Sequence, residues 1–463
     1  MKLITLTLAA TLAISAQTVK LPPFSKTTLP NGATLILLER SELPLVSIGI
    51  TVRGGSEANP PGLAGLASLT ADLMSRGTTT RTSEQIAQTL DSLGAGLRGN
   101  VNEQTMVFGI ESLDKDADRA LEILADIVRN PSFPEAEVNK RLAQALDGVR
   151  ARKDNPQAAL SQYFSAFFYG ANHPYAQPDG GDEASLARIN REAIVQFHQR
   201  MVVGKNLTIL AGGRFDAAAM KAKLEKAFGA IPAGTAYQWA KDPGLPRSSA
   251  PRLLLIDKPD STQTYFTIGQ PGIRKGHPDE AALSLVNTLF GGRFTSMLNE
   301  ELRINSGLTY GAGSRPALDR LTGALTISSY TKTETTERAL DITLDLLKKL
   351  NTQGLNEAQL KSAKAYTKGL FPTDRLETTD QILNILGDIE TFGLNRGEID
   401  DLFSRLDAVT VERANAIARQ YYRSDGLVFV LLGNAAKIRD VAKKYAPGNI
   451  IEVPLTKPGF STR

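Results

Sequence analysis

The sequence from Gly65 to Thr78 reads GLASLTADLMSRGT. Apolar residues recur at positions 66, 69 and 73, between a turn-rich segment and a glycine, so the stretch predicts a helix with one apolar face. Ser68, Ala71 and Asp72 lie at i, i+3 and i+4 and therefore share one side of that helix. At that spacing an inverted zinc-protease box, His-x-x-Glu-His, places two imidazoles on one metal and a carboxylate beside the attacking water. The frame of such a box is present here without its side chains.

The flanks of this stretch, Gly-Leu-Ala before it and Arg-Gly-Thr after it, resemble the insulinase/pitrilysin family, which includes the subunits of mitochondrial processing peptidase. By this resemblance Ser68 replaces the first His, Ala71 the Glu and Asp72 the second His. In the family a downstream Glu on a helix completes the ligands, and here only Asp147 offers a carboxylate in that region. We therefore interpret Ser68, Ala71 and Asp72 as degenerate metal-box positions. Because a zinc hydrolase needs three protein ligands and a base, we expect that this chain alone binds no zinc and is not an autonomous metalloprotease.

Composition narrows the class of protein. A chain of 463 residues predicts two or more domains. The formal net charge of +4, without a Lys/Arg-rich block, gives no support for binding nucleic acid. The absence of cysteine excludes disulfides and thiolate zinc sites. The three histidines, at positions 173, 198 and 277, are too far apart in sequence to form a local metal pair.

The first sixteen residues predict a secretory signal peptide. One lysine precedes about a dozen mostly apolar residues and then small residues, which is the pattern of a cleavable export signal. The apolar run is too short for a membrane span, and no later run is longer. We therefore expect a periplasmic or secreted protein without a membrane span.

The remaining chain predicts two similar halves. Asn31-Gly32 between two apolar runs indicates a hairpin, and residues 46–53 alternate like a strand. Strands are also predicted at 97–101, 105–110 and 207–210, and helices at 83–93, 116–128, 135–152, 188–201 and 217–228. Prolines and glycines between positions 229 and 251 then mark a linker.

The pattern recurs after the linker. Residues 253–256 and 264–269 repeat the early strands, 281–290 the helix at 65–77, and 411–445 the helix, strand, glycine and helix that end the first half. We expect a duplicated α+β fold, each domain a mixed or antiparallel sheet with helices on one face. The resemblance implies LuxS/metallohydrolase-like domains that form one half of a clamshell. The predicted segments are 1–16 signal peptide, 21–230 first domain, 231–250 linker and 251–455 second domain; two unrelated α/β domains are the alternative.

A second signature lies in the second half. Gly291-Gly292 precedes a predicted helix, and Arg303 is followed seven residues later by Tyr310, after Gly-Leu-Thr. The resemblance assigns this Arg and Tyr to the catalytic cleft, opposite the zinc site, and the glycine pair to substrate binding. A guanidinium and a phenol can donate to a scissile carbonyl oxygen as it gains charge. Alternatively, Arg303 caps a helix end, Tyr310 packs on a sheet and the glycines only end a helix.

Three functions are compatible with these patterns. The leading hypothesis is an exported, non-metal subunit of a heterodimeric zinc metallopeptidase, in which Arg303 and Tyr310 act in trans on an unfolded peptide. A homologous partner would carry the zinc box. The runner-up is an inert structural or peptide-binding protein, like the respiratory-complex core subunits that resemble this family. The third is an active enzyme with a weak ion held by Asp72 and Asp147, and polar helix residues are the simpler interpretation of both.

Overall fold

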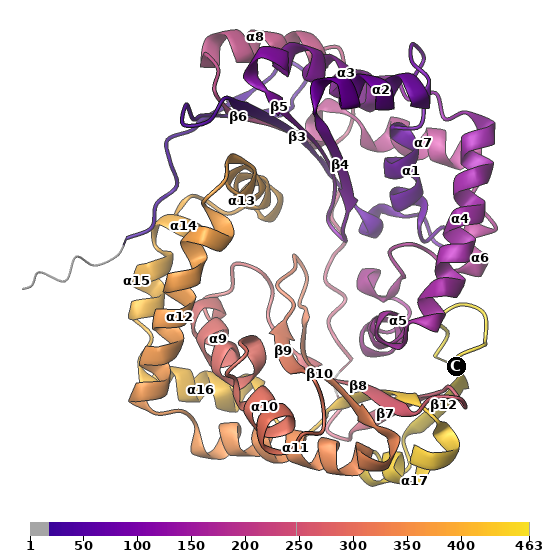
Figure 1. The fold of residues 1–463 in the computed structure, drawn as a ribbon, viewed down its shortest axis with the longest axis vertical. Coiled ribbons are helices and arrows are strands. Elements are labelled where there is room, and N and C mark those ends of the chain that lie inside the picture. Colours follow the sequence, from indigo (N-terminus) through magenta and orange to yellow (C-terminus); the bar gives the residue numbers. More distant parts are fainter. Residues whose placement is uncertain (1–17, 247, 463) are drawn as a thin grey trace, which may run out of the picture.

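The computed structural model describes residues 18–246 and 248–462, which form two halves stacked along the long axis of the molecule (Figure 1). The predicted signal peptide at 1–16 lies outside the described residues. Within those residues, none of the helices has the length and apolar character needed to cross a membrane.

The first half is built on a mixed six-stranded sheet. Its strands, in the spatial order β1-β2-β6-β3-β5-β4, pair antiparallel except for β2 with β6. The predicted Asn-Gly hairpin joins the first two strands, and Ser25 pairs with Leu37. The strands are β1 (Ser25–Thr28), β2 (Thr34–Glu39), β3 (Leu45–Arg53), β4 (Gly96–Val101), β5 (Thr105–Leu113) and β6 (Leu207–Gly213).

The second sheet repeats this topology with one change at its edge. The order β12-β7-β11-β8-β10-β9 matches the first sheet strand for strand, but the edge strand β12 comes from the end of the chain and runs parallel to β7. The duplicated α+β fold is therefore confirmed. The strands are β7 (Arg252–Asp257), β8 (Gln263–Pro271), β9 (Ala312–Pro316), β10 (Ala324–Lys332), β11 (Val428–Gly433) and β12 (Ile450–Pro454).

The helices follow the same duplication. In the first half they are α1 (Leu66–Met74), α2 (Ser83–Leu93), α3 (Ala117–Arg129), α4 (Glu135–Asp154), α5 (Pro156–Tyr169), α6 (Glu183–Leu186), α7 (Arg191–Met201) and α8 (Ala217–Phe228). In the second half they are α9 (Glu280–Asn287), α10 (Met297–Asn299), α11 (Thr336–Gln353), α12 (Glu357–Arg375), α13 (Thr379–Phe392), α14 (Gly397–Asp400), α15 (Leu402–Asp407), α16 (Val411–Tyr421) and α17 (Ala435–Tyr445). Two π-helical turns, η5 (Thr288–Gly292) and η6 (Glu300–Asn305), flank α10.

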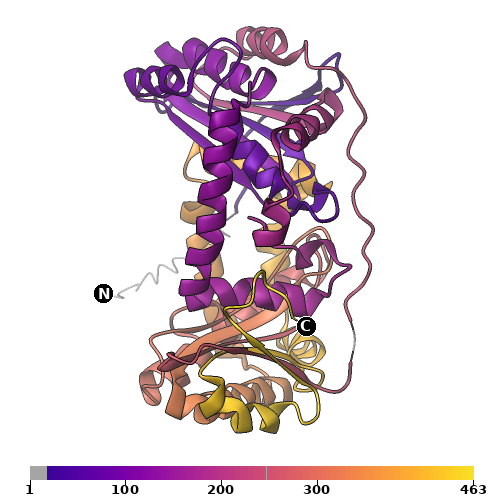
Figure 2. The ribbon, with the colours of Figure 1, turned by 90° about the vertical axis from the view of Figure 1, so that its right-hand side faces the viewer.

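One helix from each half packs on the sheet of the other half. Helix α5 packs on β8 and β11, and α13 packs on β3 and β6. Because side chains alternate across a strand, Leu253 and Leu255 join the core of the second half, whereas Leu254 and Ile256 join the core that contains α5. The chain end also crosses back, since Phe460 is buried against Tyr163 of α5 with ring centroids 5.4 Å apart. The two halves are thus interlocked, and Figure 2 shows α4 running along the side between them.

Candidate functional site

Helix α1 forms where the sequence predicts it. It starts after Gly65, which adopts a φ of 91° and lies so close to Gly180 and Gly181 that an added Cβ would come within 2.9 Å of their backbone atoms. Only glycine accommodates both conditions. Near its start, the backbone N–H of Ala67 donates to the Asn59 side chain at 2.8 Å. The apolar side of α1 is buried in the first core, as its leucine spacing predicts.

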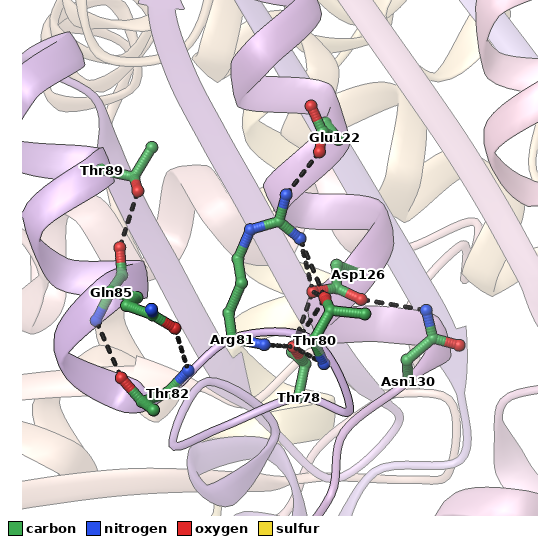
Figure 3. A network of polar contacts seen from close by, with 9 residues as sticks. All are labelled: Thr78, Thr80, Arg81, Thr82, Gln85, Thr89, Glu122, Asp126 and Asn130. Carbon is green, nitrogen blue, oxygen red and sulfur yellow. Dashed lines mark hydrogen bonds and ion pairs between the residues drawn. The ribbon is translucent and has the colours of Figure 1, made fainter.

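The far end of α1 is fixed by the segment that follows it (Figure 3). The carboxylate of Asp126 on α3 accepts from the hydroxyls of Thr78 and Thr80 at 2.6 and 2.8 Å and from the Arg81 guanidinium at 2.7 Å. Burial opposes the charge of Asp126, but these bonds and one from Asn130 outweigh it and lower the pKa of the carboxyl. The Arg-Gly-Thr flank therefore has a structural role, because it holds the exit of α1 in place.

The three box positions line one hollow of about 420 Å³ between α1 and the edge strand β4. Ser68 Oγ donates to the backbone oxygen of Asp179 at 2.9 Å. Ala71 is buried and contributes no polar atom. The Asp72 carboxylate accepts two hydrogen bonds from the Arg141 guanidinium of α4, from Nε and, at 2.8 Å, from Nη2, and a third from Arg76 at 3.2 Å.

These residues do not fit a zinc ion. Asp72 is engaged by two guanidinium groups, so positive charge already lies where a metal would sit. Ser68 turns its hydroxyl proton to a backbone carbonyl, and Ala71 supplies neither ligand nor base. Of the histidines, His173 and His198 are buried elsewhere, and His198 Nε2 lies 2.9 Å from the backbone oxygen of Val128. The described residues contain no cluster of three or more His, Asp or Glu side chains that could hold a metal.

The hypothesis of a weak ion between Asp72 and Asp147 is wrong. Asp147 lies six residues beyond Arg141 on α4, so its side chain leaves the helix about 120° away from the side that faces Asp72. Its side chain is 74% exposed and, among the residues that the structure describes, pairs only with Arg150, one turn along the same helix, at 3.2 Å. Arg141 is the residue that sequence reasoning missed, and its 69-residue separation from Asp72 leaves no local signal.

The second signature lies on the surface of the second half. Arg303 on η6 stacks its guanidinium 4.6 Å from the ring centroid of Phe294, and Tyr310 is 80% exposed just before β9. Neither side chain makes a hydrogen bond or an ion pair within the described part of the chain. Arg303 therefore does not cap a helix in this structure, and Tyr310 is not packed on a sheet.

The glycine pair has a packing role. A Cβ on the buried Gly291 would lie 2.3 Å from the backbone nitrogen of Ser314, so η5 can approach β9 only with glycine there. A Cβ on Gly292 would lie 2.8 Å from the Asn287 side-chain nitrogen. These contacts set the position of the segment that carries Arg303 and Tyr310. A contact between the glycines and a substrate stays a prediction.

Known proteins share this architecture over most of the chain. The family model described as insulinase (peptidase family M16) matches residues 35–178, and the model described as peptidase M16 inactive domain matches residues 188–366. An uncharacterized zinc protease of Mycobacterium tuberculosis is 28% identical over 85% of this chain and 90% of its own length. The uncharacterized zinc protease YmxG of Bacillus subtilis is 25% identical over 86% of this chain and 95% of its own.

Two solved structures agree with these matches. A peptidase M16 inactive domain from Pseudomonas fluorescens superimposes with a TM-score of 0.83 at 26% identity, covering 89% of this chain and 98% of that one. The first half of the periplasmic protease PqqL from Escherichia coli shares the fold, with a TM-score of 0.72 at 16% identity, covering 94% of this chain and 100% of that one. The two matched models, together with the duplicated sheets, show that the chain belongs to the insulinase family, peptidase family M16.

Proposed function

We propose that this chain is an exported, non-metal subunit of a heterodimeric M16 peptidase, and that it contributes Arg303 and Tyr310 to peptide bound by a zinc-bearing partner. One contrast carries the proposal. Asp72 is tied to Arg141 and Arg76, whereas Arg303 and Tyr310 lie at the surface with no hydrogen-bond partner in the described chain. The first site is closed by ion pairs, and the second is available to another molecule.

The second pair lies far from the altered box of its own chain. The loop after β9 reaches the first half, where Arg320 pairs with Glu57 at 3.1 Å and the backbone of Leu321 donates to the Tyr175 hydroxyl at 3.1 Å. Tyr310 precedes the opposite end of β9, a five-residue strand that spans about 15 Å. A peptide beside Tyr310 therefore lies on the side remote from that joint, which supports a role in trans.

The chemistry suits a developing oxyanion. A guanidinium and a phenol both donate hydrogen bonds, and donors aimed at a carbonyl oxygen that gains charge stabilise the transition state more than the bound substrate. The metal and the base would come from the partner.

Export and a homologous partner draw support from the comparisons. The signal-like segment at 1–16 agrees with the likeness in fold to a periplasmic protease. This chain covers 52% of full-length PqqL, so in that protein a unit with this fold is joined to further chain of similar size. We infer that a separate box-bearing chain takes the corresponding place here.

The test is to reconstitute the chain with a box-bearing M16 chain from the same source and to measure kcat and KM on an unfolded peptide. Tyr310→Phe should lower kcat by about 10²–10³, and Arg303→Ala by a similar factor, with smaller changes in KM. Tyr330→Phe, which alters a stacked tyrosine on β10, serves as the matched control. Unchanged kcat in both site variants, with the complex intact by size-exclusion chromatography, would refute the proposal and favour the inert structural protein.

A further inference from the structure

The exposed apolar side chains of this protein are concentrated in one region. Eight large hydrophobic side chains are more than a third exposed among the described residues, and five of them lie between η5 and β9 or on α12. We call these five and the two arginines beside them the aromatic surface. Single exposed apolar residues are ordinary, but a cluster indicates a binding surface. Its members are Arg293, Phe294, Arg303, Ile304, Tyr310, Tyr366 and Leu370.

The aromatic surface carries two arginines that no carboxylate neutralises. The Arg303 guanidinium lies over the ring of Phe294, and that of Arg293 lies 5.7 Å from the ring centroid of Tyr366 and donates to Ser362 Oγ at 2.9 Å. Neither arginine forms an ion pair in the described chain, although Glu300 and Glu301 lie on η6 itself and Glu301 accepts from Asn305. Two positive charges therefore sit against exposed aromatic rings.

The backbone around the aromatic surface is uncovered. A Cβ added at Gly307, Gly311 or Gly369 would meet no atom within 4 Å. Gly307 and Gly311 flank Tyr310 in the loop before β9, and Gly369 lies next to Leu370 on α12. A segment of another chain thus has space to lie beside the aromatic rings.

We propose that the aromatic surface binds an extended peptide segment in which an acidic residue neighbours an aromatic or aliphatic one. A carboxylate accepts charge-assisted hydrogen bonds from Arg303 or Arg293, and the apolar side chain covers the exposed ring of Phe294 or Tyr366. A basic segment meets repulsion from both guanidinium groups. The inference rests on the proposed function, since it names the class of peptide presented to Arg303 and Tyr310, but peptide binding requires only this chain.

The experiment measures peptide binding by the full chain without a partner. Three fluorescein-labelled twelve-residue peptides, alternating Asp-Phe, Asn-Phe or Lys-Phe with glycine and serine, are titrated by fluorescence anisotropy at low and moderate salt. We expect the Asp-Phe peptide to bind at least about fivefold more tightly than the Asn-Phe peptide, with the Lys-Phe peptide weakest. Added salt should reduce this preference, because exposed charges are screened.

Variants locate the binding. Phe294→Ser and Arg303→Gln should each weaken binding of the Asp-Phe peptide by about fivefold or more, whereas Arg303→Lys should retain part of the charge preference. Arg150→Gln, at an exposed arginine on α4, is the matched control and should bind like the unaltered chain. Circular dichroism and melting of each variant show whether it remains folded.

Two results would overturn this inference. They are equal binding of the acidic and basic peptides, and unchanged binding by folded Phe294→Ser and Arg303→Gln variants. Neither result involves turnover. A heterodimer whose kcat still depended on Tyr310 would then leave the proposed function standing, whereas peptide binding without any effect of Tyr310→Phe on kcat would refute the proposed function alone.

Discussion

The joint between the halves predicts a stability that depends on pH. Glu103, in the turn between β4 and β5, is half-buried, and its backbone oxygen accepts from the N–H of Glu57 at 3.0 Å. Glu57 in turn pairs with Arg320, from the loop that follows β9. Burial raises the pKa of Glu103 to about 7, and the charges of Asp179 and Asp319 add to the rise. Ionising this carboxyl therefore acts against the contact between the halves.

The direction in which pH changes the folding stability follows from the number of protons bound by each state. The pKa of Glu103 is about 7 in the folded chain and 4.5 at its ordinary value, so between these limits the folded state binds more protons than the unfolded state. Its favourable contribution is complete below pH 4.5 and is lost as the pH rises through about 7. That interval corresponds to at most about 3.4 kcal/mol, and residual contact with water reduces the expected loss to about 1–3 kcal/mol. Glu103→Gln keeps the shape of the protonated acid and should abolish this loss.

The assay is urea unfolding at pH 5 and pH 8, followed by tryptophan fluorescence. Trp239 is the single tryptophan of the chain, and the Arg320 guanidinium lies 5.0 Å from its ring centroid, so it reports on this joint. Glu103→Gln should exceed the unaltered chain in unfolding free energy by about 1–3 kcal/mol at pH 8 and by much less at pH 5. Glu334→Gln, at an exposed glutamate, is the control. The same difference between Glu103→Gln and the unaltered chain at both pH values would refute the reasoning.

Three further predictions concern the altered box and the chain end. Elemental analysis of the purified chain should find no stoichiometric zinc, and one tightly bound zinc per chain would contradict this. The triple variant Ser68→His, Ala71→Glu and Asp72→His should not reach the turnover of a box-bearing relative, because Arg141 still occupies the site and the third metal ligand is still absent. Full turnover by this variant would contradict the second expectation. Phe460→Ala should cost about 2–4 kcal/mol of unfolding free energy, because the buried ring packs on Tyr163, and a midpoint unchanged in urea would show that the crossing chain end contributes nothing.

Local signals predicted the elements around the site. The Asn-Gly turn predicted the β1–β2 hairpin, and leucine spacing predicted α1, because both depend on residues a few positions apart. Helix α5 was not predicted, although Asn155-Pro156 is a start signal and Asn155 does cap it. The packing partners of α5 could not be predicted from local sequence, since β8 and β11 lie about a hundred residues or more further along the chain.

The candidate site divides in the same way. The degenerate box positions could be read from the sequence. The ion pair that Asp72 forms could not, because its partner, Arg141, comes from α4. Exposure of Tyr310 was equally unreadable, since the alternation of β9 does not extend into the loop before it. Spacing along the sequence predicts which residues share a helix or strand, whereas contacts between residues of different elements depend on how those elements pack.

The ion pair between Asp72 and Arg141 also helps to explain the role of Arg303 and Tyr310, the second signature. In metal-bearing relatives, as the resemblance implies, a zinc ion ties the box helix to a later helix through a distal Glu. Here two hydrogen bonds between Asp72 and Arg141 join α1 to α4, so that connection between the helices is kept without a metal. The connection between α1 and α4 therefore does not involve Arg303 or Tyr310, which lie on the other half and form no hydrogen bond or ion pair within the described chain. An exposed tyrosine and an unpaired arginine add little to stability where they stand, and binding another molecule is the role that their positions support.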